Sequence, residues 1–453
     1  MYKKEYHIHF VGIGGIGMSG IAELLINTGY KVSGSDIALS EITKRLEKLG
    51  VKIFDLHHKN NIANANVVVY SSAVSSDNPE IVQAKKAVIP VIPRAEMLAE
   101  LMRLKYSIAV AGAHGKTTTT SITSWVLQKG GLDPTVVIGG KLNTIGTNAI
   151  LGKGDYIVAE ADESDGSFLK FAPTISIITN IDEDHLDYYQ NINAIKETFI
   201  QFIEKIPFYG LTILCADDPN IKAIMPQIKK RHTTYAIDTK ADITASDITF
   251  KGEQTEFIVY NKQKKLGKAV LNLAGIHNVY NALAAIAVAL ELAIPFNAIQ
   301  EALTTIPKVE RRLEIKGAVN NTIIIDDYGH HPTEIKTTLK TAKTIWKDKR
   351  LVVIFQPHRY SRTKLLFNNF KRAFFYADKL IVIPIYSAGE KQIKEATSKS
   401  LCQSITEVGH KNAIYIDSKE KTILYLKKAL KPNDILITLG AGDVWKIGEA
   451  LLK

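Results

Sequence analysis

The sequence predicts an α/β protein with three domains, and three observations support this fold class. Short apolar runs, typical of buried strands, alternate with helical stretches along most of the 453 residues. Two glycine-rich turns, at residues 12–17 and 112–115, each follow such a strand and open a helix, as in nucleotide-binding domains built on parallel sheets. The alternation begins again near residue 106 and after residue 308. We therefore expect a Rossmann-like domain over 1–104, a central domain over 105–308 and a second Rossmann-like domain over 309–453.

The composition is that of a globular protein with a basic surface. Lysine and arginine number 57 against 46 acidic residues, a net charge of +11. Because these charges are scattered in short clusters, they indicate a solvated surface that suits anionic small molecules rather than nucleic acid. Cys215 and Cys402 lie far apart in apolar runs and indicate reduced core residues. No apolar run reaches the length of a membrane span, so we expect a cytoplasmic protein without membrane insertion.

The most specific motif is the glycine loop that follows Ala111 and reads Gly-Ala-His-Gly-Lys-Thr-Thr. Its glycines let backbone N–H groups converge on a phosphate, and the helix N-terminus adds partial positive charge. Lys116 can reach the outer phosphates, and the Thr117 hydroxyl can ligate Mg²⁺. The loop is shorter than that of a GTPase, because Val110 stands where the usual P-loop has its first glycine. We therefore predict a P-loop-type ATPase domain whose ATP contacts are Gly112, Ala113, His114, Gly115, Lys116, Thr117 and Thr118.

The first glycine loop fits a dinucleotide-binding fingerprint. It follows a strand expected over residues 7–11, and Asp36 ends the next strand, about where a ribose-binding acid is found. Taken alone, this pattern favours NAD, but the glycines indicate only that a pyrophosphate can approach a helix N-terminus, and any nucleotide diphosphate has one. A second ligand-facing loop is expected after a strand over residues 67–70. The candidate contacts are Gly12, Gly14, Gly15, Gly17, Asp36, Ser71 and Ser72.

Acidic and polar side chains follow two strands of the predicted central sheet. Glu160 comes directly after a strand over residues 156–159, and His185 follows a strand over residues 175–179. Parallel strands bring their carboxyl ends to the edge of the sheet where the phosphate loop lies. We therefore predict that Thr117, Glu160 and His185 hold Mg²⁺, for which oxygen ligands are preferred. Three further acids are equally compatible with helix caps or solvated loops: Asp162, Asp165 and Asp182.

The stretch over residues 241–272 has a different character. Its short alternating runs predict antiparallel hairpins on the side of the central domain. A long alanine-rich helix then begins at residue 275 and extends to about residue 293. Adenine recognition and helix capping are equally compatible with the polar side chains at its start, which are His277, Asn278 and Asn281.

The C-terminal third again alternates strands and helices, with strands expected over residues 322–326, 351–355, 380–383 and 435–438. Loops rich in histidine and arginine follow the first two of these strands. Arginine offers planar bidentate donors, so these loops indicate an anionic substrate. A metal at His330 and His331 is disfavoured, because no third ligand stands at metal spacing in the sequence.

Six motifs together resemble those of the Mur ligases of peptidoglycan synthesis. They are the ATP loop, Glu-Ala-Asp-Glu-Ser-Asp from residue 160, Asp-Glu-Asp-His-Leu-Asp from 182, His-Asn-Val-Tyr-Asn-Ala from 277, Asp-Asp-Tyr-Gly-His-His-Pro-Thr-Glu from 326 and Gln-Pro-His-Arg-Tyr-Ser-Arg from 356. The resemblance spans essentially the full chain. The whole superfamily shares the ATP loop, including its shortened form, whereas the last two motifs are more specific.

The resemblance implies ATP-dependent ligation of L-alanine to the lactyl carboxylate of UDP-N-acetylmuramate through an acyl phosphate. The N-terminal domain would then bind UDP rather than NAD, the central domain Mg-ATP, and the C-terminal domain L-alanine. By the same resemblance, Lys116 would contact the β- and γ-phosphates, Thr117 and Glu160 one magnesium ion, and His185 a second. Asn278 and Asn281 would contact the adenine, and further nucleotide contacts would come from Arg312 and Asp327, in addition to the candidate His277 at the start of the alanine-rich helix.

The resemblance also implies which residues surround the muramyl substrate and the incoming alanine, namely Tyr328, His330, His358, Arg359 and Arg362. The catalytic residues would be Lys116, Glu160, His185, His330 and Arg359. We expect a monomer or a weak homodimer.

Three alternatives remain open on the sequence. A recycling ligase of the same family would join UDP-N-acetylmuramate to a preformed peptide. An NAD-dependent oxidoreductase is supported only by the first glycine loop and leaves the ATP loop unexplained. A nucleotide-gated binding protein without chemistry would have no use for the histidine and arginine loops. Phosphate release from ATP in the presence of the separate substrates distinguishes these alternatives.

Overall fold

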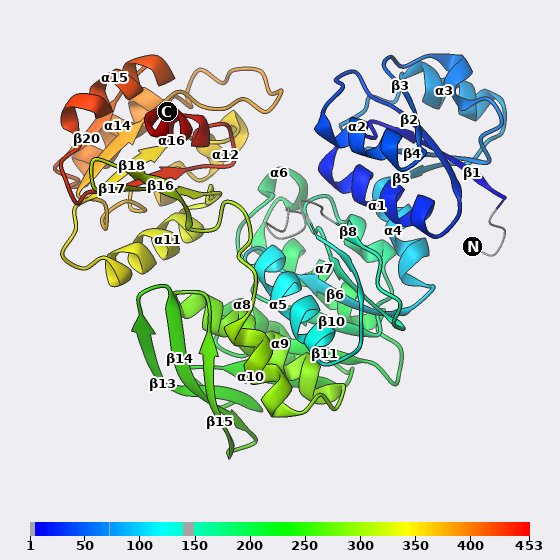
Figure 1. The fold of residues 1–453 in the computed structure, drawn as a ribbon, viewed down its shortest axis with the longest axis horizontal. Coiled ribbons are helices and arrows are strands. Elements are labelled where there is room, and N and C mark those ends of the chain that lie inside the picture. Colours follow the sequence, from blue (N-terminus) through cyan, green and yellow to red (C-terminus); the bar gives the residue numbers. More distant parts are fainter. Residues whose placement is uncertain (1–4, 72, 139–148) are drawn as a thin grey trace.

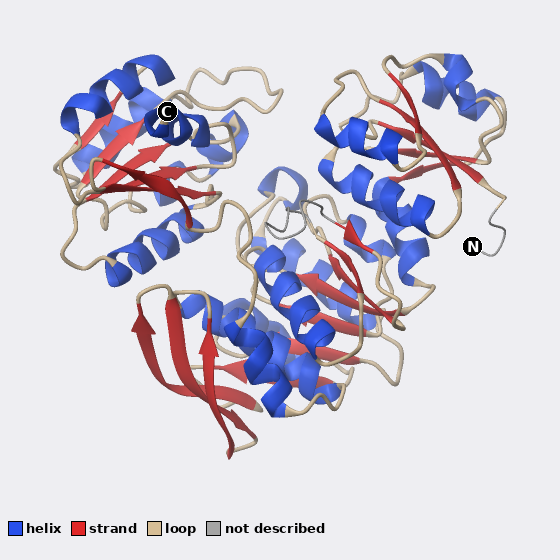
Figure 2. Ribbon diagram, in the orientation of Figure 1, coloured by secondary structure: helices blue, strands red, loops and turns tan. Residues whose placement is uncertain are grey.

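A computed structural model describes residues 5–71, 73–138 and 149–453. It confirms the predicted α/β class, because three separate sheets each carry helices on their faces (Figures 1 and 2). In the view of Figure 1 the N-terminal and C-terminal domains lie above the central domain. The boundaries at residues 104 and 308 stay a prediction. Among the described residues, no helix is long and apolar enough to cross a membrane.

The N-terminal domain has a five-stranded parallel sheet in the order β3-β2-β1-β4-β5. Its strands are β1 (His7–Val11), β2 (Lys31–Ser35), β3 (Lys52–Phe54), β4 (Val67–Tyr70) and β5 (Val91–Pro93). Its helices are α1 (Ile16–Asn27), α2 (Glu41–Lys48), α3 (Pro79–Lys86) and α4 (Arg94–Met102), with a 3-10 turn at Lys59–Ile62. The last strand, β5, does not include the apolar Val88 and Ile89 before it, because Val88 has a φ of 57° just after α3.

The central domain is built on a ten-stranded sheet in the order β15-β14-β13-β12-β11-β10-β6-β9-β7-β8. Its strands are β6 (Tyr106–Ala111), β7 (Thr135–Val137), β8 (Ala149–Ile150), β9 (Tyr156–Glu160), β10 (Ile175–Ile178), β11 (Leu211–Cys215), β12 (His232–Ala236), β13 (Ile243–Lys251), β14 (Gln254–Asn261) and β15 (Lys264–Leu271). Its helices are α5 (Lys116–Lys129), α6 (Leu186–Tyr189), α7 (Ile192–Glu204), α8 (Pro219–Ile224), α9 (Ile276–Glu291) and α10 (Phe296–Thr304), with 3-10 turns at Ser167–Lys170 and Met225–Gln227.

The predicted hairpins extend this sheet rather than forming a separate unit beside it. β13, β14 and β15 pair antiparallel with one another, as expected. However, β13 also pairs in parallel with β12, with Tyr235 opposite Ile243. The hairpins are therefore the far edge of the sheet that carries the ATP loop, as Figure 1 shows at the lower left.

The C-terminal domain has a six-stranded sheet in the order β16-β17-β21-β18-β19-β20. Its strands are β16 (Glu314–Val319), β17 (Thr322–Asp327), β18 (Leu351–Phe355), β19 (Lys379–Val382), β20 (Ala413–Tyr415) and β21 (Ile435–Leu439), and only β16 is antiparallel to its neighbour. Its helices are α11 (Pro332–Ile345), α12 (Tyr360–Leu365), α13 (Phe367–Phe370), α14 (Ser398–Glu407), α15 (Lys419–Ala429) and α16 (Trp445–Leu452).

The two junctions between domains differ in chemistry. Met97 and Leu101 of α4 belong to the same apolar cluster as Phe168 of the central domain, so the first two domains share a continuous core. The C-terminal domain has its own two apolar clusters, one for each face of its sheet, and neither includes a described central-domain residue. It meets the central domain instead through charged contacts, such as that of Arg362 with Asp184.

Candidate active site

The ATP loop joins β6 to α5 in a conformation that requires glycine at two points. Gly112 has a φ of 131° and Gly115 a φ of 81°, values that other residues rarely adopt. A Cβ at Gly112 would also overlap the Thr179 hydroxyl. Asn180 holds the turn between them, because its Oδ1 accepts from the N–H of His114 at 2.8 Å and its Nδ2 donates to the carbonyl of His114 at 2.9 Å. Asn180 is a contributor that the sequence patterns do not single out.

Lys116 folds back over the loop that it follows. Its Nζ donates to the carbonyl oxygens of Gly112 at 2.7 Å and Ala113 at 3.3 Å, and to Glu163 Oε1 at 2.8 Å. Burial favours the neutral amine, but the nearby carboxylates raise the pKa of Lys116 above its usual value. Burial also raises the pKa of Glu163. A phosphate group that enters the loop therefore competes with Glu163 for the ammonium group of Lys116. Glu163 was not among the predicted site residues.

Of the three predicted magnesium ligands, Thr117 and Glu160 contact each other, whereas His185 lies beside Glu163. The Thr117 hydroxyl donates to both carboxylate oxygens of Glu160, at 3.1 and 3.0 Å. His185 has a φ of 55°, and its Nε2 lies 3.8 Å from Glu163 Oε1. Glu163 Oε2 is buried and has no hydrogen-bond partner among the described residues. These oxygens fit Mg²⁺, which prefers oxygen ligands and binds through one or two carboxylates together with substrate phosphates.

A cavity of about 510 Å³ lies between the central and C-terminal domains beside this loop. Its volume is in the range of pockets for small ligands and cofactors. Most of the predicted nucleotide contacts line it, namely His114, Gly115, Thr118, His277, Asn278, Asn281, Arg312 and Asp327. Leu273 and Trp346 also line it and add apolar surface; they were not predicted because neither belongs to a recognisable motif.

The capping interpretation of the two asparagines is wrong. α9 begins at Ile276, its N-cap is Gly275, and no side chain caps it. Asn278 Nδ2 donates to the carbonyl of Ala274 at 2.7 Å, and Asn281 Oδ1 accepts from the Thr119 hydroxyl at 3.0 Å. Asn281 thus connects α9 to α5, and Asn278 is held between Asn281 and the segment before α9.

Two other predicted nucleotide contacts have definite roles in the fold. Asp327 accepts hydrogen bonds from the N–H groups of Leu313 and Gly329, both at 2.9 Å, and burial raises its pKa. Asp327 therefore braces the entry into the C-terminal domain as well as lining the cavity. Burial, assisted by the charge of Arg312, lowers the pKa of His277 to about 4, so that its imidazole is neutral.

The histidine and arginine loops of the C-terminal domain converge. The rings of His330 and His358 lie 5.8 Å apart, and Tyr328 packs edge-on against His330 at 5.4 Å. Arg362 lies 3.3 Å from His358 Nδ1 and 3.4 Å from Asp184 Oδ1 of the central domain. The Nε of Arg359 is buried and has no hydrogen-bond partner among the described residues.

Burial and the nearby arginines keep both imidazoles neutral. They lower the pKa of His330 to about 3 and that of His358 to about 4. His330 Nδ1 lies 3.2 Å from the carbonyl oxygen of Tyr328. Because a carbonyl only accepts, Nδ1 carries the proton and the free lone pair of His330 is on Nε2.

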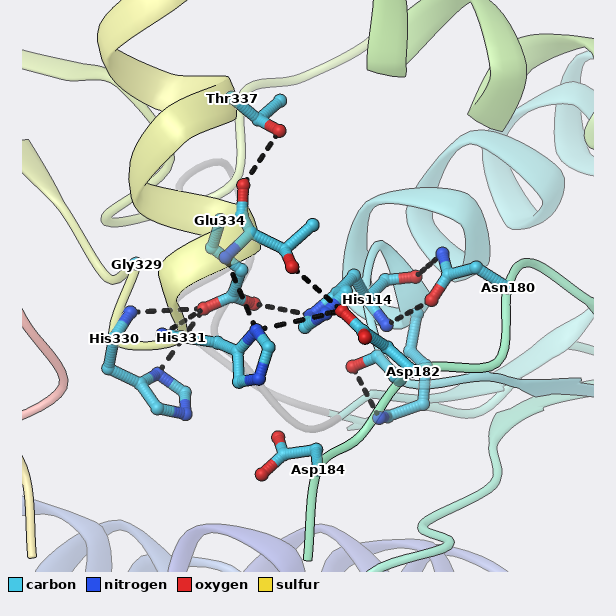
Figure 3. Close-up of polar contacts among 12 residues, drawn as sticks. His114, Asn180, Asp182, Asp184, Gly329, His330, His331, Glu334 and Thr337 are labelled. Carbon is cyan, nitrogen blue, oxygen red and sulfur yellow. Dashed lines mark hydrogen bonds and ion pairs between the residues drawn. The ribbon is translucent and has the colours of Figure 1, made fainter. Parts of the chain in front are cut away.

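A polar cluster that was not predicted joins the ATP loop to the start of α11 (Figure 3). His114 Nε2 lies 2.9 Å from Asp182 Oδ2, and His114 Nδ1 lies 3.5 Å from Glu334 Oε1. Thr333 donates to the same oxygen of Asp182 at 2.7 Å. The sequence leaves the role of Asp182 open. In the structure its side chain makes a contact between two domains, rather than capping a helix or facing solvent alone.

The first glycine loop lies in the N-terminal domain between β1 and α1. Asp36 Oδ2 accepts from the N–H of Gly14 at 2.8 Å, and Gly12 has a φ of 81°. Arg94 lies against Gly17 and 3.7 Å from Asp162, which connects this loop to the strand ends of the central domain. The remaining predicted contacts Gly15 and Ser71 belong to the two loops as expected, and Ser72 lies outside the described residues.

This three-domain fold, with an ATP loop in contact with Glu160 and Glu163 and a cavity beside the loop between the central and C-terminal domains, is that of a nucleotide-dependent ligase family. The chain belongs to the Mur ligase family. The description "Mur ligase family, catalytic domain" matches residues 7–106, "Mur ligase middle domain" matches 110–289, and "Mur ligase, glutamate ligase domain" matches 311–442. The predicted family resemblance is confirmed.

Among its relatives, UDP-N-acetylmuramate--L-alanine ligase of Desulfatibacillum aliphaticivorans is 58% identical over 452 residues, covering 100% of this chain and 99% of that protein. The enzyme of the same name from Geobacter sulfurreducens is 55% identical over 453 residues, covering 100% and 98%. Among solved structures, UDP-N-acetylmuramate-alanine ligase of Thermotoga maritima superposes with a TM-score of 0.83 at 31% identity, covering 98% of each chain. A murein peptide ligase of Psychrobacter arcticus gives 0.73 at 27% identity, covering 99% of this chain and 98% of that one.

Proposed function

We propose that this protein ligates L-alanine to the lactyl carboxylate of UDP-N-acetylmuramate at the expense of ATP, giving UDP-N-acetylmuramoyl-L-alanine, ADP and phosphate. The observation that carries the proposal is full-length identity of 58% to a relative named for this reaction. The ATP loop with its Thr117–Glu160 pair, the adjacent interdomain cavity, and the histidine and arginine loops that contact Asp184 of the central domain also support the proposal.

The first step is transfer of the γ-phosphoryl group to the lactyl carboxylate. A carboxylate oxygen attacks the phosphorus, the bond to the bridging oxygen breaks, and ADP leaves with an acyl phosphate formed. Lys116 supports this step, because its ammonium group can leave Glu163 and contact the β- and γ-phosphates. Thr117 and Glu160, with His185 nearby, would hold Mg²⁺, which when bound neutralises charge on the phosphate oxygens.

The second step is attack of the alanine amine on the activated carbonyl, after which phosphate leaves and an amide remains. The amine must first lose a proton from its ammonium form. His330 Nε2 is the candidate acceptor, because its tautomer leaves this lone pair free. Burial, together with the charge of Arg362, now lowers the pKa of His330, and an anionic acyl phosphate beside Arg362 would offset the part that is due to Arg362. Arg359, with its unpartnered buried Nε, is suited to hold an anionic group of the substrate.

The N-terminal glycine loop is the proposed site for the UDP group, with Asp36 positioned to accept from a ribose hydroxyl. Because both ATP and UDP-sugars are cytoplasmic metabolites, we propose the cytoplasm as the place of action. We also propose a monomer or weak homodimer that binds no nucleic acid.

The test is phosphate release from ATP with UDP-N-acetylmuramate and a panel of acceptors: L-alanine, glycine, L-serine, D-glutamate and the tripeptide of a recycling ligase. Stimulation by L-alanine supports the proposal, whereas stimulation by the tripeptide alone would assign the chain to the recycling reaction. NAD reduction without phosphate release would contradict both.

A substitution in the ATP loop tests the proposed role of the domain. Lys116→Ala is expected to lower phosphate release at least about a hundredfold, since it removes a charge aimed at the phosphates, while binding of UDP-N-acetylmuramate is retained. Lys129→Ala, at the other end of α5, changes a partly exposed lysine that pairs with Glu301 at 3.7 Å and serves as the matched control. Loss of sugar binding with retained turnover would refute the domain assignment.

A further inference from the structure

Three side chains from three different elements meet where the C-terminal domain touches the ATP loop. They are His114 of the ATP loop, Asp182 after β10, and His331 at the N-cap of α11. One ligand atom from each lies within 4.8 Å of the others. Figure 3 shows the two imidazoles and the carboxylate facing one another. The sequence alone disfavours a metal at His331 because no third ligand is near in the chain, but the fold supplies two from another domain.

The spacing is close to that of a first coordination shell. Asp182 Oδ2 lies 2.9 Å from His114 Nε2 and 3.7 Å from His331 Nδ1. Ligand atoms around tetrahedral Zn²⁺, at about 2.0–2.2 Å from the ion, lie about 3.3 Å from each other. A small adjustment of side chains would therefore bring all three atoms to bonding distance of one ion.

His331 is buried and its Nδ1 is only weakly engaged within the fold. The side chain is only 2% exposed. Its Nδ1, the atom that faces Asp182, accepts only a long hydrogen bond, at 3.3 Å, from the N–H of Thr333. The lone pair on Nδ1 is therefore one that a metal ion can use.

The surrounding groups orient the ligands as supporting residues do in metal sites. Glu334 Oε1 lies 3.5 Å from His114 Nδ1, so a proton on Nδ1 points to a carboxylate, and the ion would displace the Nε2 proton that faces Asp182 in the metal-free protein. The Thr333 hydroxyl donates to Asp182 at 2.7 Å and fixes that carboxylate. Two imidazoles and one carboxylate favour Zn²⁺, Co²⁺ or Ni²⁺ over Mg²⁺. This set is distinct from the oxygen pair of Thr117 and Glu160.

We propose that His114, Asp182 and His331 form a binding site for a divalent transition metal ion of the Zn²⁺ type, which joins the central and C-terminal domains at the ATP loop. The fourth position of the ion is open to water or to an anionic ligand. Because two ligands come from one domain and the third from another, the bound ion fixes the distance between the ATP loop and α11.

The test is a titration of the full-length protein with Zn²⁺ against a chromophoric chelator, in the absence of nucleotide and with excess Mg²⁺ to occupy oxygen sites. One equivalent of Zn²⁺ is expected to bind, and His331→Gln is expected to weaken this binding at least tenfold. His232→Gln is the control, because this exposed imidazole hydrogen-bonds only to the carbonyl oxygen of Lys230 among the described residues and should leave Zn²⁺ binding unchanged. Circular dichroism melting checks that each variant is folded.

Co²⁺ gives a second readout that does not depend on activity. Four-coordinate Co²⁺ with imidazole ligands absorbs strongly in the visible range, and this band is expected in the unmodified protein and absent in His331→Gln. Should that variant fail to fold, Asp182→Asn removes a ligand from the other domain and is expected to weaken binding likewise. The proposal is overturned if the unmodified protein binds no Zn²⁺ in competition with the chelator, or if both variants bind it as tightly as the unmodified protein.

Discussion

In the metal-free protein, the ion pairs of His114 make the contact between the central and C-terminal domains depend on pH. Burial alone favours the neutral imidazole, but Asp182 and Glu334 raise the pKa of His114 from 6.5 to about 9. At about 1.4 kcal/mol for each tenfold change in proton affinity, this corresponds to a stabilisation of about 3 kcal/mol. Because the pKa is higher in the folded state, the stabilisation is fully present below pH 6.5 and is lost as the pH rises through about 9.

Urea unfolding of the protein and of His114→Gln, followed by tryptophan fluorescence from pH 6.5 to 10, measures this contribution. The difference in the free energy of the first unfolding transition is expected to shrink by about 3 kcal/mol over that range. His232→Gln is the control, because His232 is exposed and contacts only the carbonyl oxygen of Lys230. A difference between the protein and His114→Gln that stays constant from pH 6.5 to 10 would show that His114 is not charged in the folded protein.

Two substitutions probe the ATP loop itself. Glu163→Gln removes the carboxylate that competes with phosphate for Lys116, so ATP is expected to bind several-fold more tightly in the presence of EDTA. Calorimetry measures this affinity, and equal or weaker binding would contradict the competition. Gly112→Ala forces a φ of 131° on alanine and drives its Cβ into Thr179, so the melting temperature is expected to fall by several degrees. Gly50→Ala, with a φ of 94° but open space around the Cβ, should cost only about 1 kcal/mol, and an equal loss in both variants would show that the overlap is unimportant.

The long buried strands could be predicted from the sequence because their apolar runs are continuous. β6, β10 and β18 fall where the runs indicate. The short strand β3 and the edge strand β16 were missed, since none of their residues is fully buried and they have no continuous apolar run. The attachment of the hairpins to the main sheet was also missed, because the parallel pairing of β12 with β13 leaves no local signal.

The candidate site could be predicted where a loop carries its own motif. The ATP loop and the Thr117–Glu160 pair lie together because both follow strands of one parallel sheet. Glu163 was missed because it lies inside an acidic run whose members look alike in sequence. The cluster around His114 and Glu334 was missed for another reason: its members come from two domains, and only their packing brings them into contact.

The unlike chemistry of the two junctions has a consequence for how the molecule responds to salt. Apolar packing around Phe168 is insensitive to moderate ionic strength, and the pairing of Arg362 with Asp184 is largely buried, so that salt screens it only weakly. Added salt should therefore act mainly on the more exposed ion pairs, such as that of Arg94 with Asp162. The first two domains keep their shared apolar core at any ionic strength, whereas the charged contacts of the C-terminal domain hold only while water is kept out of them.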